Sequence, residues 1–211
     1  MKGDDFRSSN LAIAFKKKYS GIPENQDERL LESIIKIVST SCNPRQKIDA
    51  SLTEVAVLIH RMMNFKQVAI ALRDRKDGLF RYRIFLGYRQ ESVSAFKKIT
   101  YSITDIADKR KFPRIEINRN VHFFLAEFKP YLPGEEETFS FPTQMDTARK
   151  SLDESIEGDY FEFYLFGDLD ELCGFIELSR PSNGKLPSRQ MIKWIELTAM
   201  VLGKSICSRN L

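Results

Sequence analysis

The chain has 211 residues, with 33 Lys and Arg against 29 Asp and Glu, and a formal net charge of +4. This length suits one domain with a large loop region better than two full domains. No apolar run reaches the roughly 18 residues that a membrane-spanning helix needs. No apolar segment precedes the first lysine cluster as it would in a signal peptide. We therefore expect a cytoplasmic protein that does not enter a membrane.

The charges and cysteines narrow the function further. Acidic residues gather in 115–172 and leave the remainder of the chain basic, but its lysines and arginines are scattered. This pattern does not favour nucleic-acid binding by this chain alone, which usually needs a basic helix or stripe. Cys42, Cys173 and Cys207 lie far apart without a CxxC pair. Their spacing argues against a disulfide and a zinc site and favours a reducing compartment.

The first quarter of the chain is predicted to be helical. Residues 1–24 form an N-terminal arm or a lead-in helix. Apolar residues at intervals of three and four predict helices over 27–41 and 46–63, separated by Asn43-Pro44. His60 lies beside the apolar face of the second helix. Without a second histidine four residues away, we interpret it as a structural side chain and expect no metal site.

The pattern then changes to period two. Residues 67–73 and 79–88 alternate in polarity around Asp77-Gly78, which predicts a β-hairpin. The elements expected after it are a short helix over 91–98, a brief strand over 99–103, a helical turn capped by Thr104, and a strand over 114–118.

Residues 119–158 are predicted to form an insertion, or flap. The segment contains many aromatic residues, three prolines and a run of glutamates. Its aromatic content favours a partly folded flap over a disordered linker, which is the alternative. Short helices are expected near 121–128 and 147–155.

The last third of the chain predicts a second hairpin and a terminal helix. Residues 159–180 alternate around the Gly167–Asp170 turn, and 188–208 carry one apolar stripe. The fold class is therefore α+β, with a central antiparallel sheet of about five or six strands. The N- and C-terminal helices are expected on one face of this sheet, and the short helices and flap on the other.

Four stretches give this order of elements a family resemblance. They are Val68–Asp74 in the first strand, Leu86-Gly87 closing the second, Phe163–Leu165 with Leu172–Leu178 in the late hairpin, and Leu186 before the helix containing Trp194. The chain resembles a GAF domain, the small-molecule-sensing module of signalling proteins, as a single domain over 25–211. None of these stretches is a catalytic signature.

The resemblance implies that a small ligand would lie between the sheet and its roof of short helices and flap. An aromatic cavity with few polar groups would suit a flat or apolar ligand, or none. Plain core packing is the alternative for every candidate side chain. The candidates are Phe85, Phe96, Tyr101, Ile106, Phe112, Ile117, Phe163, Cys173 and Phe175.

Known subtypes of the family are not matched. Cyclic-nucleotide-binding members show Asn-Lys, Phe and Asp-Glu where this chain has Ser179-Arg180, Leu186 and Gln190-Met191. Bilin-binding members attach their chromophore through a Cys-His pair, which this chain lacks. The sequence thus indicates no particular cofactor.

The sequence therefore predicts a non-catalytic sensory domain that binds a small molecule or an effector protein. Its terminal helices would transmit the signal and pair two copies as a homodimer. Two alternatives stay open. One is an enzyme similar to free methionine-R-sulfoxide reductases, acting through Cys173, although a second thiol within reach of it is not expected. The other is the regulatory part of a transcription factor.

Overall fold

A six-stranded antiparallel sheet lies at the centre of the computed structural model, which describes residues 13, 16, 25–41 and 46–209. The strand order is β2-β1-β6-β5-β4-β3, so both predicted hairpins belong to one sheet and the predicted fold class is confirmed. The strands are β1 (Phe65–Arg73), β2 (Phe80–Leu86), β3 (Ile115–Glu116), β4 (Val121–Phe124), β5 (Tyr160–Phe166) and β6 (Leu172–Pro181).

The chain divides into two units, Met1–Ile35 and Lys36–Leu211. Helix α2 (Gln26–Ser41) crosses this division and confirms the helix predicted over 27–41. The predicted arm, apart from Ile13 and Lys16, lies outside the described residues. No helix in the described part of the chain is long and apolar enough to cross a membrane.

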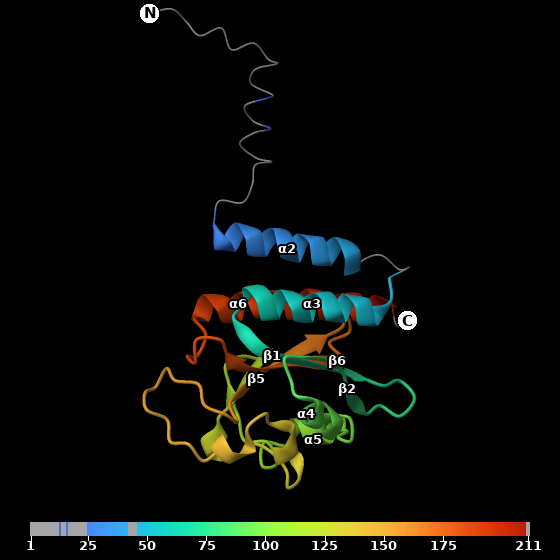
Figure 1. Ribbon diagram of the computed structural model, residues 1–211. Helices are drawn as coiled ribbons and strands as arrows, with labels where there is room; N and C mark the ends of the chain where they lie inside the picture. The colour runs from blue at the N-terminus through green and yellow to red at the C-terminus, as the bar shows by residue number, and fades with distance from the viewer. Residues whose placement is uncertain (1–12, 14–15, 17–24, 42–45, 210–211) are drawn as a thin grey trace, which may run out of the picture. The chain divides into compact units, whose positions relative to one another are not determined.

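Two helices cover one face of the sheet. Helix α3 (Ile48–Met62) packs on β1 and β2, and α6 (Arg189–Arg209) packs on β5 and β6 (Figure 1). Residues on their sheet-facing sides are buried, and Val55 and Ile195 have no exposed surface. Gly203 lets α6 approach β5 closely, because a Cβ atom there would lie 2.7 Å from the Phe166 carbonyl oxygen.

The roof covers the other face (Figure 1). We use this name for α4 (Gln90–Phe96), α5 (Ile103–Ala107) and the segment 126–144 with its three short 3-10 helices. Helix α5 begins at Ser102, whose hydroxyl accepts a hydrogen bond from the Asp105 amide while the Asp105 carboxylate accepts one from the Ser102 amide. This capping box replaces the predicted cap at Thr104, because only Ser102 stands three residues before an acidic residue.

Three predicted elements were wrong. The helix near 121–128 is strand β4 followed by a 3-10 turn, because the buried Val121–Phe124 segment pairs with β5. The strand over 99–103 is a single bridge between Phe80 and Tyr101. The helix near 147–155 is a series of turns held by Arg149, which bonds the Asp159 carboxylate at 2.8 Å.

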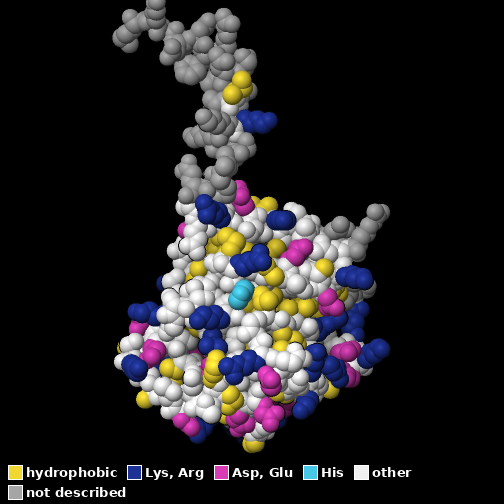
Figure 2. Space-filling view, in the orientation of Figure 1, with side chains coloured by type: hydrophobic (Ala, Val, Ile, Leu, Met, Phe, Trp, Pro, Cys, Tyr) yellow, Lys and Arg dark blue, Asp and Glu magenta, His cyan; other side chains and the backbone are white. Residues whose placement is uncertain are grey.

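Charges of both signs share the face of the molecule that Figure 2 shows. Figure 2 shows basic and acidic side chains interspersed over the visible face. Such mixing is typical of a solvated surface rather than of a nucleic-acid-binding one.

Candidate functional site

A cavity of about 40 Å³ lies between the sheet and the roof. Since a water molecule needs roughly 10–15 Å³ measured in this way, the cavity has room for a few waters. Its floor comes from β2, β5 and β6, and its cover from α4, α5 and 130–139. The lining side chains are mostly aromatic rings and glutamates: Tyr82, Phe96, Tyr101, Phe112, Phe124, Tyr131, Phe139, Tyr160, Phe175, Glu135, Glu162 and Glu177.

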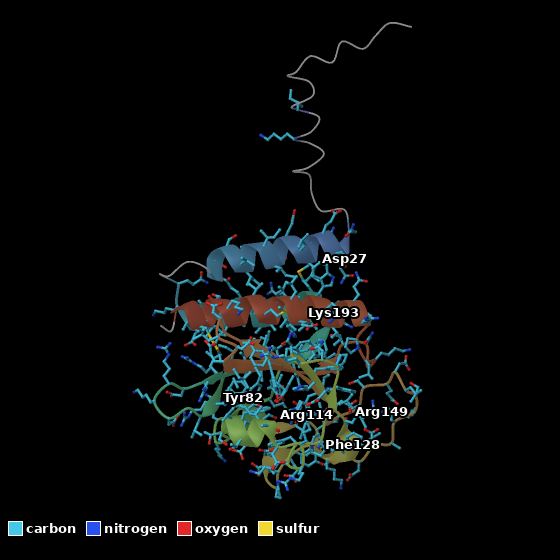
Figure 3. The ribbon with its side chains drawn as sticks, turned by 180° about the vertical axis from the view of Figure 1, so that it is seen from behind. Asp27, Tyr82, Arg114, Phe128, Arg149 and Lys193 are labelled. Atoms are coloured by element: carbon cyan, nitrogen blue, oxygen red, sulfur yellow. A yellow bond between two sulfur atoms is a disulfide. The ribbon has the colours of Figure 1, made fainter. Side chains whose placement is uncertain are left out.

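Tyr82 is the central ring of this aromatic wall. Its centroid lies 4.6 Å from that of Phe96 and 5.6 Å from that of Phe175, which it meets edge-on. Period-two alternation explains the position, because Tyr82 on β2 points to the roof (Figure 3). Packing between these rings forms the apolar part of the cavity wall.

Three carboxylates interrupt this apolar lining. Glu177 accepts a hydrogen bond from the Tyr82 hydroxyl at 2.6 Å. Glu135 accepts one from the Tyr101 hydroxyl at 2.9 Å and one from the Leu132 amide at 2.8 Å. Glu162 is the direct cross-strand neighbour of Glu177. The cavity is therefore acidic as well as aromatic.

Burial changes the protonation of these carboxyl groups. It raises the pKa of Glu162 to about 8, and the neighbouring Glu177 charge adds to the effect. Burial likewise raises the pKa of Glu177 to about 7, although the hydrogen bond from Tyr82 works in the opposite direction. The pKa of Glu135 is also raised by burial. Near neutral pH the cavity thus holds carboxyl groups that can give up a proton when a positive charge arrives.

Solved structures of other proteins share this fold, although sequence comparisons find no match. No protein-family model matches the sequence, and the search of curated proteins finds no similar sequence. Among solved structures, the GAF domain from an Acinetobacter phosphoenolpyruvate-protein phosphotransferase has a TM-score of 0.54 at 14% identity, covering 85% of this chain and 93% of that one. This chain has the GAF fold.

Two further structures are similar. The GAF domain/HD domain protein from Geobacter sulfurreducens has a TM-score of 0.55 at 9% identity, covering 78% of this chain and 94% of that one. A methyl-accepting chemotaxis protein has a TM-score of 0.53 at 12% identity, covering 86% and 98%. At such identities the likeness concerns the GAF fold alone.

Five of the nine predicted site residues line the cavity of this GAF fold: Phe96, Tyr101, Ile106, Phe112 and Phe175. Phe85 packs beside it, with its ring 5.6 Å from that of Phe96. The other three lie elsewhere. Ile117 is exposed after β3, Phe163 points to the helix-covered face, and Cys173 is bonded to another cysteine.

The prediction that the cysteines form no disulfide was wrong. Cys173 and Cys207 form a disulfide with a Cα–Cα distance of 6.9 Å, joining the start of β6 to the last turns of α6. The two residues are 34 positions apart, and only the return of α6 across the sheet brings them together. With Glu171 they form a cluster of potential metal ligands in the described part of the chain. Two mutually bonded sulfurs, however, offer no thiolate to a metal.

The three glutamates of the cavity were not predicted from the sequence. Glu162 stands between Tyr160 and Tyr164 on the roof-facing side of β5. A charged residue on an otherwise aromatic strand face was therefore the sequence signal that could have indicated it. Glu177 gave the same signal in β6. Glu135 gave none, because it belongs to a run of three glutamates that reads as a solvated turn. The expectation of a cavity with few polar groups was therefore wrong.

Proposed function

We propose that the protein is a non-catalytic sensory domain that binds a small molecule in the cavity under the roof and transmits the bound state through its terminal helices. The observation that carries this proposal is the cavity on one face of β5 and β6, with α6 on their other face. A ligand larger than a few waters requires the roof segment around Tyr131 and Phe139 to move outward.

The lining favours a ligand that carries a positively charged nitrogen. Aromatic faces attract cations, and carboxylates in a medium of low dielectric attract them more strongly. Glu162 and Glu177 lie opposite one another across the β5–β6 pair and so supply this charge at one place. The ligand class thus differs from the flat, apolar molecule that the sequence suggested.

A matched pair of probes tests the ligand class. Tetramethylammonium and tert-butanol have similar shapes, but only the first is charged. We expect tetramethylammonium to raise the melting temperature of the full chain, since a ligand that binds only the folded state stabilises it. Glu177→Gln is expected to abolish this shift, and the exposed Glu137→Gln to preserve it. Equal shifts with both probes, or an equal response in both variants, would refute the cationic ligand.

The described residues that line the cavity include no cysteine, which supports a binding role over thiol chemistry. Neither Cys173 nor Cys207 lines it, and their sulfurs are bonded to each other. Incubation with free methionine sulfoxide and a thiol reductant tests the alternative enzyme. Turnover that disappears in Cys173→Ser would overturn the non-catalytic proposal.

The homodimer is proposed through the helices α2 and α6. Leu197 and Met200 leave 40% and 47% of their surfaces exposed on α6, which supports a helical contact with a second copy. Light scattering is expected to give the mass of two chains for the wild type and of one chain for Leu197→Glu.

A cytoplasmic location remains the prediction from the sequence. The disulfide argues against this location, because such bonds are rare in reducing compartments.

A further inference from the structure

A second hollow lies on the roof side of the sheet, around β3, β4 and the Phe166–Leu172 end of the late hairpin. This groove has a volume of about 860 Å³ and shares only Ile106 with the lining of the acidic cavity. We call it the arginine groove, after Arg73, Arg114 and Arg119 on its walls. All its lining residues belong to the second unit of the chain.

Two buried polar side chains in this groove have an atom without a partner. His122 and Tyr164 are 5% and 7% exposed and line the groove. The His122 Nδ1 and the Tyr164 hydroxyl find no hydrogen-bond partner among the described residues, and the same holds for the Arg114 Nε. Buried polar groups are satisfied in the great majority of cases. The convergence of three exceptions on one groove points to a ligand.

The rings of His122 and Tyr164 hold each other in place. Their centroids are 4.5 Å apart and their planes are nearly perpendicular. The two residues come from the neighbouring strands β4 and β5 and point to the same face. Burial, followed by the charge of Arg114, lowers the pKa of His122 to about 4, so the imidazole is neutral near pH 7. A neutral imidazole has one N–H donor and one acceptor nitrogen, so it can donate one hydrogen bond to an anion without adding charge.

The groove carries an excess of positive charge. Arg114 contacts only the carbonyl oxygens of Phe112 and Ala107, each at 3.4 Å, and no carboxylate of the described residues forms an ion pair with it. The two acidic residues on the walls are already engaged. Glu116 pairs with Lys109 at 2.9 Å, and Asp170 pairs with Arg119 at 3.2 Å.

Arg119 also shapes the groove. Its guanidinium lies 4.6 Å from the centroid of the Phe166 ring, so it is held by stacking as well as by Asp170. Arg73 donates to the Gly78 carbonyl oxygen at 3.2 Å and is exposed. Arg114, labelled in Figure 3, is thus the arginine of this groove that is partly buried and has no direct ion pair with a described carboxylate.

We propose that the arginine groove binds a small molecule through a carboxylate or phosphate group. Arg114 supplies the charge, and its Nε together with the His122 imidazole and the Tyr164 hydroxyl supplies the hydrogen bonds. Charge-assisted bonds from arginine are the common way in which proteins hold such groups. The groove borders the acidic cavity, since His122 lies opposite Glu162 on the neighbouring strand, but the two linings share only Ile106. A failure of anion binding in the groove would therefore leave the proposed function intact.

Titration calorimetry of the full chain at low ionic strength tests the site, with inorganic phosphate and citrate as probes. We expect Arg114→Gln to weaken binding by about tenfold or more, because it removes a hydrogen bond to a charged group. The matched control is Arg110→Gln, which removes a 93% exposed arginine four residues away and changes the net charge equally. This control is expected to bind like the wild type. Binding of either probe with this pattern supports the site, and the tighter probe identifies the chemical group.

Tyr164→Phe keeps the test decisive if Arg114→Gln fails to fold. It removes only a hydroxyl that has no partner within the described residues, so it costs the fold no internal hydrogen bond. We expect this variant to be at least as stable as the wild type and to bind the anion more weakly. The proposal is overturned if neither probe binds at millimolar concentration, if Tyr164→Phe binds as tightly as the wild type, or if Arg110→Gln weakens binding as much as Arg114→Gln.

Discussion

The carboxyl of Glu162, a half-buried side chain, is expected to make the protein less stable as the pH rises. Its pKa is about 8 in the folded chain, against an ordinary value of 4.5. The folded state therefore binds more protons than the unfolded state between these two values. Because stability falls with pH wherever the folded state holds the extra proton, the free energy of unfolding decreases from about pH 4.5 to about pH 8.

The size of the effect follows from the shift. Each pKa unit corresponds to about 1.4 kcal/mol, so the full shift sets an upper value of about 5 kcal/mol. Water entry and side-chain movement lower this figure, and we expect a loss of about 2–4 kcal/mol across the window. Glu162→Gln keeps the shape of the side chain and removes the ionisation. This variant should therefore be more stable than the wild type at about pH 8.5, by about 2 kcal/mol or more.

Urea unfolding at about pH 5.5 and about pH 8.5 measures this difference for the wild type, Glu162→Gln and the control Glu137→Gln. The control removes an exposed carboxylate from the roof, and its stability should follow that of the wild type at both values. Some pH dependence will persist in Glu162→Gln, because the pKa of Glu177 is also raised. If Glu162→Gln lost as much stability with rising pH as the wild type, Glu162 would not hold its proton in the folded chain.

Three further predictions concern stability. Thiol titration of the denatured, unreduced chain should give one free thiol out of its three cysteines, and three free thiols would contradict the disulfide. In urea unfolding, Cys207→Ser should cost about 3–4 kcal/mol, because the bridge closes a loop of 34 residues. Ser102→Ala should cost about 1 kcal/mol through loss of the α5 cap, whereas Ser94→Ala on α4 should change little. Gly174→Ala places a Cβ atom 2.3 Å from the Ala71 carbonyl oxygen. This variant should lose about 1–3 kcal/mol of unfolding free energy, measured as a lower melting temperature. An unchanged melting temperature would show that β1 and β6 separate easily.

Local periodicity was sufficient to predict most of the architecture. Strands such as β1 and helices such as α3 show their buried faces in the spacing of apolar residues, and their bounds differ from the predicted ones by only a few positions. Val121–Phe124 could not be assigned in this way, because a short, continuously apolar segment has no period. It becomes a strand since β5 offers it a partner, with the Phe124 ring stacked 4.4 Å from that of Tyr160.

The candidate site was harder to predict because it is built from distant segments. Glu135 comes from the flap, Glu162 from β5 and Glu177 from β6, and no local pattern relates the first to the other two. The Cys173–Cys207 bond has the same origin, since it depends on the course of α6 across the sheet. Side chains whose roles depend on one strand, such as Phe175, were identified correctly as cavity-lining, whereas Phe163 points to the opposite face.

The alternation of β6 suggests how a ligand in the cavity would influence α6. Glu177 faces the cavity, and its neighbours Ile176 and Leu178 point into the layer under the helices with no exposed surface. A close-packed layer transmits small displacements rather than absorbing them. We therefore expect tetramethylammonium to change amide hydrogen exchange in α6 in the wild type but not in Glu177→Gln. Binding without any change in α6 would separate ligand recognition from transmission and would refute the path through β6.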